Sequence, residues 1–296
     1  MTAPHTTSPR QHPEAPSRFA GIPGRPLAIL TTLAAALVTA LFVVPGRLAA
    51  NGSAGGSLDE DELADAFRKA FVEYWNAGER NFSPGMERVI DYWFRFHVAK
   101  AVIAAILLIV LVALGALVVK AFLKAGDLGA GWRTAFAAAG VLVTLCALFA
   151  SVTVMANIQG AVAPFASLLS MLPTGATDGE LAGVLGQVRQ HLAAPAGTAD
   201  RTPPPLDLMI GDFARYHVAM AVIAAVVALV LIGVSVAAWR RFAGTKSSDR
   251  RTRRLSAWCG VLAALSALVL IVVGVANTST ARDSRPALAA FFDGGW

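Results

Sequence analysis

The chain has 296 residues, of which 56% are hydrophobic and only 15% are charged. Soluble domains carry about 25% charged residues, so the composition excludes an ordinary soluble protein. Several apolar runs reach the roughly 20 residues that cross a bilayer as a helix, whereas the strands of a membrane barrel are short and alternate. The sequence therefore predicts an all-α, polytopic helical membrane protein. The net charge of +6 lies beside the apolar runs, which indicates membrane topology and not a nucleic-acid partner.

The N-terminal part predicts a tail followed by a membrane anchor. Residues 1–25 are rich in Pro, Ser, Thr and Arg, and such a segment cannot bury enough surface to fold. The next run, 27–44, is longer than the 7–15-residue core of a signal peptide. We expect a disordered cytoplasmic N-terminus and then a transmembrane helix over 26–45 that serves as a signal anchor. Cleavage after Leu48-Ala49-Ala50 stays open as the alternative.

The segment 51–97 predicts an amphipathic helix outside the bilayer. Ser57 and Glu60 have the spacing of a capping box that starts a helix. Apolar residues then recur every four positions, which places them on one helix face: Leu63, Phe67, Phe71 and Trp75. This stripe either packs within the chain or presents Phe67, Phe71 and Trp75 to another membrane or extracytoplasmic protein. Ser83-Pro84 then predicts a new helix that continues into the second apolar run.

Four further apolar runs complete the predicted set of five transmembrane helices: 98–119, 134–156, 218–238 and 255–276. The segment 157–215 between the middle runs repeats the plan of 51–97. Thr177 and Glu180 have capping-box spacing, and Pro195 is expected to end that helix. The prolines at 203–205 predict a stiff linker.

Lys and Arg predict the orientation of the helices. The segment 240–254 is the most basic part of the chain, so it is expected on the cytoplasmic side. Five crossings then place the N-terminus in the cytoplasm and the C-terminus outside. Abundant Ala, and Arg in excess over Lys, favour a bacterial plasma membrane. The basic loop could also bind anionic lipid, although a topology signal alone explains it.

An internal duplication relates the two halves of the chain. Residues 95–105 read RFHVAKAVIAA and residues 215–225 read RYHVAMAVIAA, an offset of 120. The same offset pairs Asn157 with Asn277. We assign repeat 1 to 57–170 and repeat 2 to 177–296. Because both copies enter the membrane from the same side, they are parallel repeats, and we expect a pseudo-two-fold four-helix bundle with the first helix beside it.

Polar residues gather at the outer ends of the predicted helices. They form a candidate ligand-binding set: Arg95, His97, Lys100, Asn157, Arg215, His217 and Asn277. Two arginines could hold an anionic group, and two imidazoles could ligate a metal or a haem. The simpler interpretation is that these side chains reach the interface and cap the bundle by hydrogen bonds. We expect the histidines on separate flanks, each bonded to the asparagine of its own repeat.

No residue pattern in the chain predicts catalysis. The middle of each apolar run lacks the charged residue of an ion-coupled transporter, and no phosphate loop, HExxH or nucleophile elbow occurs. We therefore assign no catalytic residue, no metal and no cofactor. The favoured function is a scaffold, partner subunit or accessory factor. The alternatives are a channel or small-solute carrier lined by Thr153, Cys146 and Ser266, and a redox protein with His97 and His217 as ligands.

Overall fold

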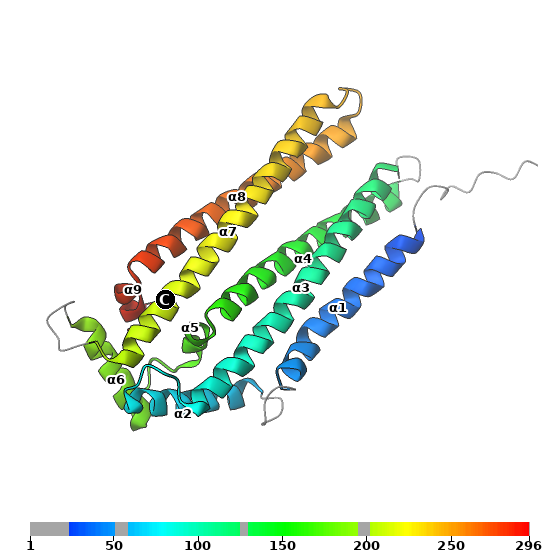
Figure 1. The fold of residues 1–296 in the computed structure, drawn as a ribbon. Helices are drawn as coiled ribbons and strands as arrows, with labels where there is room; N and C mark the ends of the chain where they lie inside the picture. The colour runs from blue at the N-terminus through cyan, green and yellow to red at the C-terminus, as the bar shows by residue number, and fades with distance from the viewer. Residues whose placement is uncertain (1–23, 51–58, 125–129, 195–201, 296) are drawn as a thin grey trace, which may run out of the picture.

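The computed structural model describes residues 24–50, 59–124, 130–194 and 202–295. All regular secondary structure within these ranges is helical. Five helices are long and apolar enough to cross a membrane, and Figure 1 shows them running side by side: α1 (Gly24–Ala50), α3 (Pro84–Lys124), α4 (Ala130–Val162), α7 (Pro204–Gly244) and α8 (Arg250–Arg282). The predicted all-α class is confirmed for the described residues, as is the prediction of five helices that are long and apolar enough to span a membrane.

The long helices pack mainly as two hairpins. The first hairpin is α3 with α4, the second is α7 with α8, and α1 lies against α3. The hairpins meet through α4 and α7. A two-fold axis between the hairpins would pack α3 against α8 as extensively as α4 packs against α7. Within the described residues, α3 and α8 do not pack extensively. The described contacts therefore do not show the expected pseudo-two-fold bundle.

Two of the helix ends that differ from the prediction lie at proline. Pro45 lies inside α1, which continues to Ala50, because a spanning helix tolerates proline when other groups satisfy the freed carbonyl. The prolines at 203–205 do not form a linker, since α7 begins at Pro204. Proline suits the first helical positions, where the missing N–H has no partner to lose. Residues 1–23, Ser57 and Pro195 lie outside the described residues, and the expectations about residues 1–23 and Pro195 stay predictions.

The short helices gather at one end of the long ones, which we call the cap end (Figure 1). The helical cap consists of these helices and the first turns of α3 and α7: α2 (Glu60–Ala77), α5 (Pro164–Leu168), η2 (Leu169–Met171), α6 (Gly179–Ala193) and α9 (Ser284–Phe292). The opposite end, where each hairpin turns, is the loop end.

The cap helices begin one or two residues later than the predicted capping boxes. Asp59, and not Ser57, is the N-cap of α2: its carboxylate accepts from the backbone N–H of Glu62 at 2.8 Å, and its own N–H donates to Glu62 at 3.1 Å. The N-cap of α6 is Asp178, without a side-chain cap bond, in place of Thr177. Gly78 ends α2 with φ of 66°, a left-handed conformation that glycine adopts without steric cost.

An aromatic core holds the helical cap together. Phe67 and Phe71 are fully buried, and Trp75 is nearly so; Trp75 Nε1 donates to Gln187 Oε1 at 2.8 Å. The apolar stripe of α2 is therefore buried within the helical cap, and a role in binding a partner stays a prediction. Tyr74 donates to the carbonyl of Arg80 at 3.2 Å, and burial raises the pKa of its phenol to about 12.

Candidate functional site

A histidine–asparagine pair stands at the cap end of each hairpin. His97 Nδ1 lies 2.8 Å from Asn157 Oδ1 in the first hairpin, and His217 Nδ1 lies 2.8 Å from Asn277 Oδ1 in the second. Each pair joins a long helix to its own partner, as the sequence analysis expected. A hydrogen bond between two helices inside a bilayer contributes about 1 kcal/mol, so each pair fixes the packing of its hairpin.

The asparagines determine which histidine nitrogen carries the proton. Asn157 Nδ2 donates to the carbonyl of Thr153 at 2.7 Å, and Asn277 Nδ2 donates to Val273 at 2.9 Å. Each amide oxygen must then accept, so Nδ1–H is the donor on both imidazoles. This arrangement holds both rings in one tautomer and in one orientation.

The cap end of α4 lies between the two sites. Gly160 faces the imidazole of His97 so closely that a Cβ built on it would lie 2.5 Å from Nε2. The preceding residue, Gln159, donates to the carbonyl of Tyr216 on α7 at 3.1 Å. One turn of α4 therefore contacts His97 and the residue next to His217 at once.

Replacing Gly160 by alanine is expected to lower the free energy of unfolding by about 2 kcal/mol, in the range of overpacked cores. The added methyl would overlap three ring atoms of His97 at 2.5–2.7 Å, and the ring is held by Asn157 and by Trp93, whose ring centroid is 4.5 Å away. Thermal unfolding in detergent measures the effect.

Gly233→Ala is the matched control, because Gly233 lies within spanning helix α7 and a Cβ there meets nothing within 4 Å. Alanine is a better helix former than glycine, so this control should be neutral or slightly stabilising. Equal melting temperatures for the two variants would contradict the close contact between Gly160 and His97.

The charged members of the candidate set pair locally. Arg95 forms an ion pair with Asp91 at 3.4 Å, and Arg215 forms one with Asp212 at 3.0 Å. The Lys100 ammonium lies 5.1 Å from the ring centroid of Phe96. Each of these contacts lies within a single helix, two of them in α3 and one in α7. The structure thus brings together the histidines and asparagines hairpin by hairpin, but it does not gather the seven residues around one cavity.

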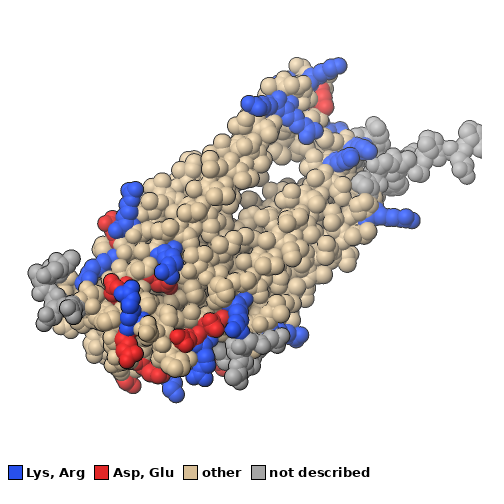
Figure 2. All heavy atoms as spheres, in the orientation of Figure 1, with Lys and Arg blue, Asp and Glu red and all other residues tan. Residues whose placement is uncertain are grey.

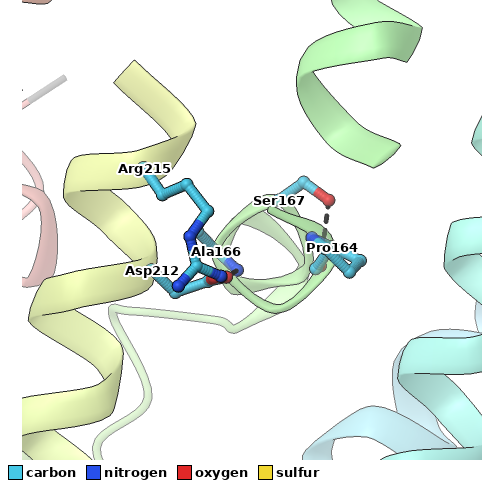
Figure 3. Close-up of polar contacts among 5 residues, drawn as sticks. All are labelled: Pro164, Ala166, Ser167, Asp212 and Arg215. Carbon is cyan, nitrogen blue, oxygen red and sulfur yellow. Dashed lines mark hydrogen bonds and ion pairs between the residues drawn. The ribbon is translucent and has the colours of Figure 1, made fainter. Parts of the chain in front are cut away.

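Asp212 links the second hairpin to the cap, and the sequence analysis missed it. Its side chain is buried: Oδ2 accepts from the N–H of Ala166 in α5 at 2.8 Å, while Oδ1 accepts from Arg215. Figure 3 shows Asp212 directed from α7 toward α5, with Arg215 beside it. The signal in the sequence was the carboxylate itself, because it interrupts the apolar start of the helix that precedes His217. At the offset of 120, the corresponding residue before His97 is Tyr92.

The geometry does not favour a metal or haem at His97. The described residues contain no cluster of three or more His, Cys, Asp or Glu that could hold a metal. An ion bound at Nε2 would need a bond of about 2 Å, and Nε2 of His97 is buried. Each histidine–asparagine pair can therefore hold the two helices of its hairpin in register and fix the orientation of the imidazole ring. The chemistry that the pair supports is hydrogen bonding.

Comparison with known proteins adds no assignment to this site: no protein-family model, no curated protein and no solved structure matches the chain.

Proposed function

We propose that this chain is a multi-pass protein of the bacterial plasma membrane that acts as a scaffold, partner subunit or accessory factor. The N-terminus lies in the cytoplasm, and the helical cap and the C-terminus lie outside. Figure 2 supports the orientation, because the loop end carries Lys and Arg with few carboxylates whereas the cap end mixes both signs. An excess of Lys and Arg marks the cytoplasmic side of membrane proteins.

The duplicated sequence supports the description of the two hairpins as repeats. Helices α3 and α7 each have 41 residues, and α4 and α8 each have 33. The histidine and asparagine of each pair are 60 positions apart in both hairpins. Equivalent positions can therefore be compared at an offset of 120.

One such comparison carries the proposal of a partner. Met155 on α4 is only 6% exposed, and Gln159 on the same face bonds to α7. The equivalent residues on α8 are Val275, which is 65% exposed, and Ser279, also exposed. Repeats that pack head-to-tail, here through α4 of the first hairpin and α7 of the second, leave the equivalent face of the last repeat uncovered. That uncovered face is the face of α8 that carries Val275 and Ser279.

The uncovered face borders a groove suited to a helix. The groove has a volume of about 550 Å³ and is lined by Ala221, Ala225 and Gly274 beside Val275. Small residues allow the backbones of two helices to approach closely in a membrane. Ser279 lines the groove at the position equivalent to Gln159, which in the first hairpin donates to a helix carbonyl. We propose that a transmembrane helix of a partner protein occupies this groove.

Site-specific photo-crosslinking in native membranes tests the proposal. A photoreactive residue at position 275 should form an adduct with one membrane protein, through a transmembrane segment. The matched control is position 272, also valine on α8 and 61% exposed, where lipid adducts are expected. The change Ser279→Phe, which fills the groove, should abolish the adduct, whereas Val272→Phe should not. Lipid adducts alone at position 275, or an adduct only to a second copy of this chain, would contradict a partner subunit.

The two other functions have less support. A channel lined by Thr153, Cys146 and Ser266 would need these side chains to face one path. Cys146 instead packs against the apolar cluster that α1 and α3 form with α4, and the hydroxyl of Thr153 donates to the carbonyl of Phe149 on its own helix. A redox centre would need an accessible Nε2 on His97.

A further inference from the structure

The space between the hairpins at the loop end is lined by residues of both. Two hydrogen bonds join the hairpins at the cap end, where Gln159 donates to the carbonyl of Tyr216 and the N–H of Ala166 donates to Asp212. At the loop end a cavity of about 820 Å³ lies between the last turn of α3, the start of α4 and the start of α8. Figure 2 shows Lys and Arg side chains of both hairpins on either side of an opening there. The protein thus leaves room between its hairpins where they contact each other least.

Four guanidinium groups line this cavity: Arg133 from α4 and Arg250, Arg251 and Arg254 from α8. None of the four forms an ion pair within the part of the chain that the structure describes. Among the described residues that line the cavity there is one carboxylate, Asp249, which already accepts from the N–H of Thr252 at 3.1 Å as the N-cap of α8. Hydrogen bonding from Thr252 lowers the pKa of the Asp249 carboxyl. The described lining residues therefore carry an excess of three positive charges, with guanidinium donors suited to phosphate oxygens.

The other walls of the cavity are apolar. They are formed by Phe122 and Leu123 at the end of α3 and by Leu255 and Trp258 on α8. The Arg251 guanidinium lies 6.0 Å from the centroid of the Phe122 ring, and Trp258 is largely exposed. Tryptophan is enriched at the level of lipid head groups. Arginine donors above apolar walls, at the end of spanning helices, form a surface for an amphiphilic anion.

We propose that this cavity binds an anionic phospholipid, with its phosphate on the arginines and its acyl chains along the apolar walls between the hairpins. A free phosphate would use only the arginines and would leave Phe122, Leu255 and Trp258 without a partner. Basic pockets between spanning helices on the cytoplasmic side favour anionic head groups. The bound lipid links α4 to α8 where few protein contacts do so, and it thereby holds the two hairpins at a fixed spacing.

Native mass spectrometry of the purified full chain, titrated with phosphatidylglycerol or phosphatidylcholine, tests the proposal. Phosphatidylglycerol should bind as one tight equivalent and raise the melting temperature, and phosphatidylcholine should do neither. The double variant Arg250→Gln and Arg254→Gln should weaken the binding of phosphatidylglycerol about 30-fold, from roughly fivefold for each arginine near an anionic lipid. Equal binding of both lipids would overturn the proposal.

A matched control removes the same charge elsewhere at the loop end. Arg240 and Arg241 lie at the end of α7 and do not line the cavity, so Arg240→Gln with Arg241→Gln should change lipid affinity less than about threefold. The variant Arg250→Lys with Arg254→Lys keeps the topology signal and should retain most of the binding. Displacement of the lipid by millimolar inorganic phosphate would show a free-anion site and would overturn the lipid assignment. The result is independent of the partner groove, which lies at the cap end.

Discussion

Replacing Phe67 by alanine is expected to lower the free energy of unfolding of the purified protein by about 3–5 kcal/mol, the usual range for deleting a buried aromatic ring. Phe67 is fully buried, and its ring centroid lies 5.9 Å from that of Phe71 and 6.4 Å from that of Phe165 on α5. The change removes one of the aromatic rings through which α2 contacts α5. Denaturation followed by tryptophan fluorescence measures the effect, since Trp75 lies in the same core.

Phe94→Ala provides the control for the loss of an aromatic ring. Phe94 lies on α3 and is 44% exposed, so its removal should cost much less. The pair also distinguishes the two interpretations of the α2 stripe. A ring that packs inside the cap stabilises the isolated chain, whereas a ring that waits for a partner does not. Similar stabilities of Phe67→Ala and the unchanged protein would therefore argue for the partner surface.

Replacing Asp212 by alanine is expected to lower the free energy of unfolding by about 3 kcal/mol. The change removes a hydrogen bond to a charged group and leaves the buried N–H of Ala166 without an acceptor, each a loss of about 1–3 kcal/mol. It also detaches α5 from α7, so hydrogen exchange at residues 164–168 should accelerate. Thermal unfolding together with exchange mass spectrometry measures both effects.

Asp207 supplies the comparison on the same helix. It pairs with Arg80 at 2.6 Å, but both side chains are exposed, and such surface pairs contribute about 0–1 kcal/mol. Asp207→Ala should therefore change stability little. Asp212→Asn, which keeps an acceptor for Ala166, should fall between the two alanine variants. If Asp207→Ala and Asp212→Ala are equally stable, Asp212 does not anchor α5.

The sequence by itself determined the features that depend on local residue order. Length and hydropathy identified five spanning helices, since a bilayer requires about 20 apolar residues whatever their neighbours. The spacing between the duplicated histidines and asparagines placed each pair at one depth, and the predicted bonds of His97 to Asn157 and of His217 to Asn277 are present. Helix ends were less certain: at Pro45 and Pro204 the residue type alone did not say whether a helix continues, ends or begins there.

Only the tertiary structure decided which helix faces meet. Apolar residues face lipid and neighbouring helices alike, because lipid tails are as apolar as leucine, so hydropathy could not show that α4 packs on α7. The burial of Met155 and the exposure of Val275 at equivalent positions followed from that one contact. The same holds for Gly160 and Asp212, whose neighbours His97 and Ala166 are 63 and 46 positions away. Contacts of this kind depend on how whole helices are placed, and no local pattern of residues encodes that placement.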